Sequence, residues 1–264
     1  MLELAVGTAR VVLDELHGGR VERLEVGGFA LLVPPEIDDQ NYGAFPMAPW
    51  AGRLRDGRFT FDGVEHQLPL NKPPHAIHGT VRDQHWTVVK STPRSATLSV
   101  ALADPWPFSG SVVQRFELDE HSLALTMEVH AAGHAMPASC GWHPWWNRNG
   151  VRGDPIELEL HADGMYKRDD DGIPDGELGP VTAPPWDDCF TDLGDPVAVV
   201  RWPHAASVAI SSDCSCVVVY TESEHAVCVE PQTDPPDALN LRPATIPPEG
   251  VLTAHTTWGW EIEP

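Results

Sequence analysis

The feature that most constrains this chain is an alternation of apolar and polar residues with a period of two, which recurs along most of its length. In HSLALTMEVH the apolar residues Leu123, Leu125, Met127 and Val129 fall on one face, and IELELHA repeats the pattern. Such runs, bounded by Gly, Pro, Asn and Asp, are typical of half-buried β-strands. We find no long capped segment with the 3.6-residue apolar period of a helix. An all-β protein is therefore expected.

The chain shows no sign of a division into domains. Its 26 prolines and 22 glycines are spread between the expected strands and form no linker. A propeller would show a blade-length repeat, and none is visible. With 264 residues, 42% of them hydrophobic, the chain can bury a core without a disulfide or a metal. These properties predict one large antiparallel β-sandwich over residues 1–264.

The formal net charge of −22 restricts the partners of the protein. Such a field repels phosphate backbones and anionic lipid surfaces, so we expect no nucleic-acid and no membrane partner. No stretch approaches the roughly 20 apolar residues of a membrane span. The N-terminal segment lacks the apolar core of a signal peptide, and a cytoplasmic protein is expected.

The cysteines are expected to be small buried hydrophobic residues. No pair of them has the spacing of a zinc site or of a redox Cys-x-x-Cys motif. They are Cys140, Cys189, Cys214, Cys216 and Cys228. Cysteine spacing therefore gives no indication of a metal.

Two histidines, His75 and His78, lie three residues apart in NKPPHAIHGT. The prolines before them and Gly79 after them argue against a helix. In an extended chain the two rings point to opposite faces, so one metal held by both is disfavoured. We expect one ring to face inward and the other to face solvent, and the spacing does not decide which.

A third histidine, His143, lies in the tryptophan-rich segment GWHPWWNR. One interpretation is a tryptophan core around a hydrogen-bonded histidine. The other is a sugar platform, in which Trp142, Trp145 and Trp146 stack on the C–H faces of a pyranose. Trp50, in APWAGRLRDG, adds some support to the second interpretation.

Carboxylates stand at the ends of two further apolar segments. Glu230 follows the apolar run Ala226–Val229, where burial could tune its pKa for use as a general base. Asp187 and Asp188 lie beside aromatic residues in PPWDDCFTDL. Taken alone, a carboxylate in such a place is more often an ordinary turn or edge residue.

Together, the segments PWAGRLRDG, NKPPHAIHG, GWHPWWNR, WDDCF and VCVEPQTDPPDALN, in this order, resemble the aldose 1-epimerase (mutarotase) family. The last segment matches the family's Glu-Pro-x-Thr-x-Pro-Pro-x-Ala-x-Asn and is the most specific. The resemblance runs nearly end to end. It implies a galactose mutarotase-like β-supersandwich, a monosaccharide substrate, and no need of a metal or a cofactor.

The resemblance also implies roles for individual residues. Glu230 would be the base, His143 the acid, and His78 would assist at the ring oxygen, which leaves His75 as an outward or supporting partner. The residues expected to bind the sugar are Arg53, Asp187, Trp145 and Gln232, with Asn240 as a weaker candidate.

The chain departs from the family's pattern at several places, which leaves the identity of the sugar open. Gly52 replaces the usual asparagine before the arginine, and Trp145–Trp146 replaces a Tyr-Phe pair. Arg148 stands where an apolar residue is common. The chain is also shorter than most members, so trimmed substrate loops are expected.

Interconversion of anomers requires a base at the C1 hydroxyl and an acid at the ring oxygen. Each well-placed group is worth about 10²–10⁴ in rate. To donate, His143 has to be charged, and at its ordinary pKa near 6.5 about a quarter of it is charged at pH 7. We expect Asp187 and Glu230 to raise that pKa.

The sequence thus predicts an aldose 1-epimerase acting on a free aldohexose such as glucose or galactose. One alternative is a hexose-6-phosphate 1-epimerase. Its phosphate would need cations, for which the nearby candidates are Arg53, Arg55, Arg148 and Lys72. Further alternatives are a non-catalytic carbohydrate-binding protein on the same fold and a glycoside hydrolase that uses Asp187 and Glu230.

Overall fold

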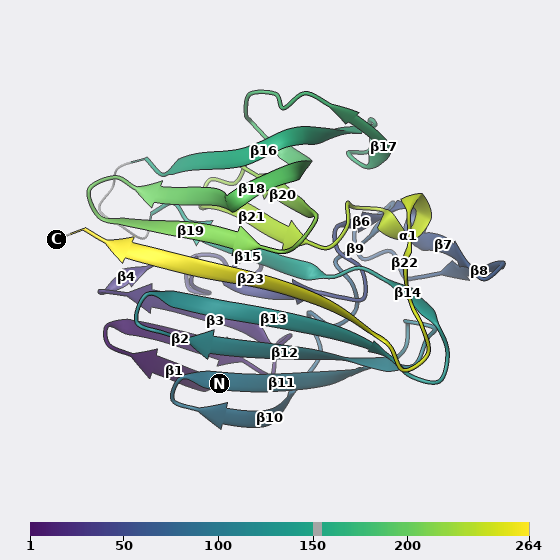
Figure 1. Ribbon diagram of the computed structural model, residues 1–264, viewed down its shortest axis with the longest axis horizontal. Helices are drawn as coiled ribbons and strands as arrows, with labels where there is room; N and C mark the ends of the chain where they lie inside the picture. The colour runs from purple at the N-terminus through teal and green to yellow at the C-terminus, as the bar shows by residue number, and fades with distance from the viewer. Residues whose placement is uncertain (150–154, 264) are drawn as a thin grey trace.

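The computed structural model describes residues 1–149 and 155–263, and these form an almost entirely antiparallel β structure (Figure 1). The strands of the large sheet in the first half of the chain are β1 (Leu2–Val6), β2 (Ala9–Asp14), β3 (Arg20–Val26), β4 (Phe29–Ala30), β5 (Ala44–Met47), β10 (Thr87–Thr92), β11 (Ser95–Leu102), β12 (Gly110–Leu118) and β13 (Ser122–Ala131). Those in the second half are β15 (Gly141–Asn147), β16 (Glu157–Arg168), β17 (Pro174–Gly179), β18 (Asp187–Trp202), β19 (Ala206–Ser212), β20 (Cys216–Tyr220), β21 (Ala226–Gln232) and β23 (Val251–Ile262).

Short elements gather at one end of the molecule, at the right of Figure 1. They are β6 (Arg53–Leu54), the 3₁₀ turn Arg55–Gly57, β7 (Arg58–Phe61), β8 (Val64–Gln67), β9 (Ala76–Ile77), β14 (Met136–Ala138), α1 (Ala238–Leu241) and β22 (Ala244–Ile246). No helix among the described residues is long and apolar enough to cross a membrane.

The pairing of the strands defines two runs that meet at β18. One run is β10-β11-β12-β13-β23-β19-β18, and the other is β1-β2-β3-β5-β15-β21-β20-β18. The first residues of β18 pair with β20 and its last residues pair with β19. The predicted antiparallel β-sandwich is confirmed, with one long strand shared by both layers.

The predicted alternation is found in the strands that have one face in the core. Along β13 every second residue is buried, including Leu123, Leu125, Met127 and Val129. These side chains join a core to which both runs contribute. The apolar period of two therefore placed the core face of this strand correctly.

Tryptophans on β15 connect the two layers across the core. The Trp142 indole N–H donates to Gln114 Oε1 on β12 at 3.1 Å, and Trp146 packs edge-on against Trp258 of β23 with ring centroids 5.1 Å apart. Trp50 is likewise buried, beside Trp106. The tryptophan-core interpretation therefore holds for Trp142, Trp146 and Trp50.

Two neighbouring strands, β15 and β21, depart from simple alternation because all seven residues of each are buried. Their inner faces carry Trp142, Trp146, Val227 and Val229 into the main core. Their outer faces are covered by other parts of the chain and carry polar side chains. The cysteines behave as expected, since all five are buried and free.

A close backbone crossing holds the segment after β9 against the outer side of this layer. Gly79 bridges to Ala48, and the Thr80 N–H donates to the Ala48 carbonyl at 2.8 Å. Gly79 has a φ of +74°, and a Cβ at this position would lie 1.9 Å from the Ala48 oxygen. Gly79 is thus required both by its positive φ and by the close approach of the Ala48 carbonyl.

We expect Gly79→Ala to lower the free energy of unfolding by about 2–5 kcal/mol, from left-handed strain and overpacking together. Gly63 is a matched control, because it has a φ of +75° and no atom within 4 Å of an added Cβ. Gly63→Ala should cost only the strain, about 1–2 kcal/mol. Urea denaturation measures both, and equal losses would contradict the role of the close approach.

Candidate active site

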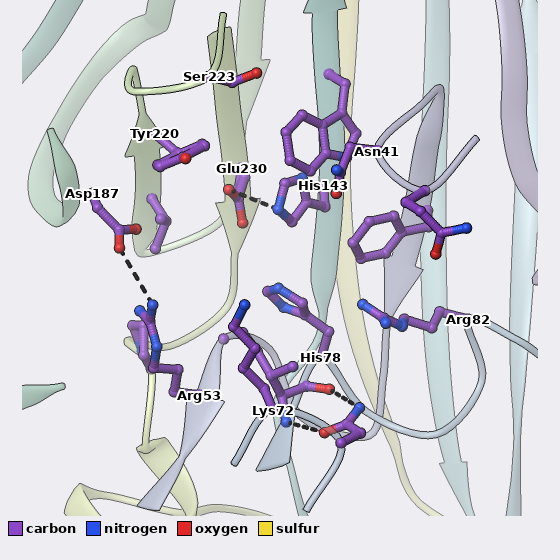
Figure 2. A pocket seen from close by; sticks show the side chains of 18 of the residues that line it. Asn41, Arg53, Lys72, His78, Arg82, His143, Asp187, Tyr220, Ser223 and Glu230 are labelled. Carbon is purple, nitrogen blue, oxygen red and sulfur yellow. Dashed lines mark hydrogen bonds and ion pairs between the residues drawn. The ribbon is translucent and has the colours of Figure 1, made fainter. Parts of the chain in front are cut away.

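The backbone register of β15 and β21 places His143 opposite Glu230. Gly141 pairs with Gln232 and Trp145 with Cys228, so the residues midway between them face each other. His143 Nε2 lies 3.2 Å from Glu230 Oε1 (Figure 2). The two residues are only 7% and 3% exposed, respectively. An imidazole and a carboxyl group are thereby held together on the outer face of the layer.

A cavity of about 550 Å³ opens over this pair. A volume of this size is typical of small-molecule sites. Its lining comes from both halves of the chain: Gln40, Asn41, Phe45, Gly52, Arg53, Asn71, Lys72, Ile77, His78, Arg82, His143, Trp145, Asp187, Val218, Tyr220, Glu222, Ser223, Glu230 and Pro236. Six of the seven predicted site residues are among them.

His78 enters the cavity from the segment after β9, in a left-handed conformation with a φ of +62°. Its ring meets that of His143 edge to face, with centroids 5.1 Å apart. His75 points away from the cavity, and its Nδ1 accepts a hydrogen bond from the Asp56 N–H at 3.1 Å. Of the two histidines, only His78 lines the cavity. The expectation that one ring faces solvent is wrong, because both histidines are buried.

Arg53 and Asp187 form an ion pair on one side of the cavity, with Nη2 3.4 Å from Oδ2 (Figure 2). Arg53 comes from β6 and Asp187 from the first residue of β18. The next residue, Asp188, is instead buried and holds Arg168 at 3.0 Å. Only the first of the two aspartates therefore reaches the cavity.

Two aromatic rings lie against the His143 imidazole. Trp145 stacks on it with centroids 4.6 Å apart and planes at 18°, and Phe45 lies at the same centroid distance, tilted by 30°. Trp145 is only 8% exposed, so little of its ring is open to the cavity. The stack fixes the orientation of His143 and removes water from its faces.

Burial reverses one expectation about the charges. It lowers the pKa of His143 from its ordinary value of 6.5 to about 3, and the nearby positive charges of Arg82 and Arg20 act in the same direction. Burial also raises the pKa of Glu230 well above its usual range; Asp187 adds to this rise and Arg53 opposes it. The expectation that acidic neighbours raise the pKa of His143 is therefore wrong, because desolvation dominates.

His78 is also held neutral. Burial lowers its pKa well below 6.5, and the positive charges around it, including Arg82 and Arg53, act in the same direction. Its Nδ1 is buried and finds no hydrogen-bond partner among the described residues. The cavity thus presents two neutral imidazoles beside a carboxyl group that resists ionisation.

Gln232, expected to bind the sugar, does not line the cavity. Its side chain is fully buried, and its Nε2 donates to the Asp234 carbonyl at 2.8 Å. Asn240 is also occupied elsewhere, since its Nδ2 donates to Asp237 Oδ1 and to the Arg58 carbonyl. Both expectations are corrected: the two side chains are hydrogen-bonded to other parts of the chain and do not line the cavity.

The cavity also contains residues that the sequence did not single out, chiefly Arg82, Asn41 and Tyr220. Arg82 lies four residues after His78, across the cavity from the Arg53–Asp187 pair (Figure 2). Its proximity to the histidine motif was the only signal available in the sequence. Gly52 lines the cavity with a φ of +67°, and a Cβ at this position would lie 2.7 Å from the Pro236 side chain, so this chain has no room for the usual asparagine unless Pro236 shifts.

A single group of three side chains in residues 1–149 and 155–263 brings together atoms that could hold a metal. It consists of His143, Cys228 and Glu230, whose ligand atoms all lie within 4.8 Å of one another. The group coincides with the imidazole–carboxyl pair and adds a buried thiol to it.

Comparison with known proteins identifies the family. The family model described as Aldose 1-epimerase matches residues 3–263. The chain belongs to the aldose 1-epimerase family. Among curated relatives, human galactose mutarotase is 29% identical over 159 residues, which cover 57% of this chain and 46% of that protein. Uncharacterized protein YihR of Escherichia coli is 27% identical over 182 residues, covering 66% and 58%. The chain thus spans about half the length of these relatives.

Solved structures of this aldose 1-epimerase fold superpose over nearly the whole chain. Galactose 1-epimerase from Lactobacillus acidophilus matches with a TM-score of 0.83 and 19% identity, covering 99% of this chain and 94% of that one. The GalM/aldose epimerase homologue from C. elegans matches with a TM-score of 0.86 and 18% identity, covering 100% and 99%. At these identities the likeness establishes the fold, which is the predicted one.

Titration by NMR of imidazole nitrogen shifts checks the electrostatics of the site. We expect His143 to stay neutral from pH 7 down to about pH 4, since burial lowers its pKa to about 3. His161, whose pKa is raised by its hydrogen bond to Glu159, is the internal control and should protonate first. Titration of His143 near pH 7 would contradict the desolvation argument.

The same shift predicts how stability changes with pH. The unfolded histidine binds a proton near pH 6.5 and the folded one does not. The contribution of neutral His143 is therefore complete above pH 6.5 and is lost as the pH falls toward 3. The unfolding temperature of His143→Asn should fall less steeply over this window than that of the unmodified protein.

Proposed function

We propose that this protein is an aldose 1-epimerase that interconverts the α and β anomers of a free aldohexose such as glucose or galactose. The observation that carries the proposal is the contact between His143 and Glu230 beneath a cavity of monosaccharide size. Ring opening of a cyclic hemiacetal requires one group that accepts a proton and one that donates a proton. The pair supplies both at one end of the cavity.

In the proposed reaction Glu230, as carboxylate, takes the proton of the C1 hydroxyl while the His143 imidazolium protonates the ring oxygen. The bond between C1 and the ring oxygen breaks, and C1 becomes a carbonyl carbon. After rotation about the C1–C2 bond the ring closes on the other face, and both protons return. No proton, electron or atom is gained or lost in the complete cycle.

Desolvation supports this proton cycle. Ring opening converts a carboxylate and an imidazolium into a carboxylic acid and a neutral imidazole. The neutral pair is the one that burial favours, because burial raises the pKa of Glu230 and lowers that of His143. The buried site therefore favours the charge state that accompanies the open-chain sugar. Transfer of one proton from the Glu230 carboxyl group to the His143 imidazole restores the carboxylate and the imidazolium that begin the reaction.

The remaining contacts fit the binding of a hydroxylated ring. Neutral His78, beside His143, can donate a hydrogen bond to the ring oxygen. Arg53 and Asp187 offer a donor and an acceptor to adjacent hydroxyls. Trp145 offers an apolar edge for the C–H groups of the sugar, although most of its face covers His143. Each of these roles is a proposal that the pattern of contacts supports.

Substitution of the acid–base pair tests the mechanism. Glu230→Gln and His143→Asn should each lower kcat by at least about a hundredfold, because each removes one proton-transfer group. Polarimetry on freshly dissolved α-glucose and α-galactose measures the rate. The surface pair His161–Glu159, with Nε2 and Oε1 3.0 Å apart, is a matched control. Its His161→Asn and Glu159→Gln variants should keep normal rates.

One outcome would contradict the assigned base, and two others would point to other functions. Near-normal turnover of Glu230→Gln would contradict the assignment of the base. Sugar binding without faster anomer exchange would indicate a non-catalytic carbohydrate-binding protein. Cleavage of an aryl glycoside would indicate a hydrolase that uses Asp187 and Glu230.

A second candidate is the epimerisation of a hexose 6-phosphate, which two cavity cations favour. Lys72 and Arg82 line the cavity, and Arg82 forms an ion pair with Asp83 at the surface. Among the described residues Lys72 makes no ion pair. Two other cations predicted from the sequence as phosphate ligands are engaged elsewhere. Arg55 is bound by Asp169, Asp171 and Asp237, and Arg148 donates to the carbonyls of Thr221, Ser223 and Ala226.

The comparison of glucose with glucose 6-phosphate separates the two candidates. If the phosphate is the substrate, Lys72→Ala should lower kcat/KM for it by roughly ten- to a hundredfold, the usual value of a charge-assisted contact. The same variant should leave the rate with glucose within about threefold. A wild-type preference for glucose, unchanged in Lys72→Ala, would dismiss the second candidate.

A further inference from the structure

Cys228 is a buried thiol beside the acid–base pair, and the proposed reaction does not use it. It precedes Glu230 by two residues on β21, so both side chains leave the same face of the strand. The register places Trp145 opposite Cys228 and His143 opposite Glu230. The thiol is fully buried and packs with the outer apolar cluster that contains Trp145 and Phe45.

We propose that His143, Cys228 and Glu230 form a three-ligand site for a thiophilic divalent cation of the zinc class, and that an occupied site blocks epimerisation. Their nitrogen, sulfur and oxygen atoms lie within 4.8 Å of one another, and no other group of three exists among the described residues. The blocking effect rests on the proposed function, but the binding does not.

The ligand geometry is close to that of a tetrahedral zinc site. Zinc binds nitrogen and oxygen at about 2.0–2.2 Å and sulfur at about 2.3 Å, which places ligand atoms roughly 3.3–3.8 Å apart. The 3.2 Å between His143 Nε2 and Glu230 Oε1 already falls near this range. A shift of the Cys228 and Glu230 side-chain atoms by about 1 Å would bring all three ligand atoms to the spacing of a zinc site. The fourth position would remain open to a water or a sugar hydroxyl from the cavity.

The charges of such a complex balance. The thiol of Cys228 and the carboxyl of Glu230 each release a proton to solvent, and the dication neutralises the two anions that result. Burial makes each of these groups hard to ionise alone, since it raises the pKa of both. A doubly positive ion with a thiolate and a carboxylate adds no net charge to a desolvated site. His143 offers a lone pair without losing a proton.

The consequence for activity follows from the shared residues. In the complex Glu230 can no longer accept the proton of the C1 hydroxyl, and His143 has no free nitrogen facing Glu230 with which to donate. Catalysis therefore stops while the ion is bound, and a chelator restores it.

Titration with Co²⁺ followed by absorption spectroscopy tests the site directly. A thiolate ligand gives a cobalt–sulfur charge-transfer band in the near ultraviolet, and a four-coordinate ion gives intense visible bands. We expect both at one Co²⁺ per chain, and Zn²⁺ should displace them. Cys228→Ala should abolish the charge-transfer band. Cys214→Ala, which removes another buried cysteine outside the group, should leave it unchanged.

Further variants guard against loss of folding. Cys228→Ser keeps nearly the same volume, and His143→Asn keeps the thiol while it removes one ligand; each should weaken Co²⁺ binding by at least about tenfold. Absence of the thiolate band in the unmodified protein, or its survival in Cys228→Ala, would overturn the proposal. Inhibition by Zn²⁺ is measured separately by polarimetry, so an inactive protein with a normal cobalt spectrum would refute the proposed function and not the site.

Discussion

A histidine and a glutamate meet at 3.2 Å in a place from which water is largely excluded, and the organisation of the cavity depends on that contact. The register of β15 against β21 creates it, because His143 and Glu230 stand on directly opposed positions. A slip of one residue in either strand would turn one of the two groups into the core. The register itself is held from the other side, where alternate residues of the same strands are large and apolar.

Those two strands combine stability and chemistry on opposite faces. The inner face packs Trp142 and Trp146 against strands of the other layer, and loss of a buried tryptophan commonly costs about 3–5 kcal/mol. The outer face keeps an imidazole and a carboxyl group away from water, which costs several kcal/mol for each group that is charged. The apolar face stabilises a scaffold rigid enough to hold the polar pair in its desolvated position.

Much of the fold could be predicted from local patterns. The period of two in β13 and similar strands reflects a sheet with one face in the core, and it identified both the all-β class and the core residues. The pattern was less informative in β15 and β21, because strands buried on both sides do not alternate in burial. Among site residues, those within recognisable segments were named in advance, whereas Arg82 and Tyr220 were not, since their relation to the cavity arises only from folding.

The sequence by itself determined the strand pattern, the family, and six of the seven residues expected at the cavity. Only the tertiary structure decided three things: the charge of those residues, the position of Gln232 outside the cavity, and the proximity of Cys228 to His143 and Glu230. The physical reason is that solvation and Coulomb interactions act through space. The pKa of an imidazole depends on the rings of Trp145 and Phe45 that cover it and on the charge of Arg82 nearby, and two of these three residues lie far from His143 along the chain.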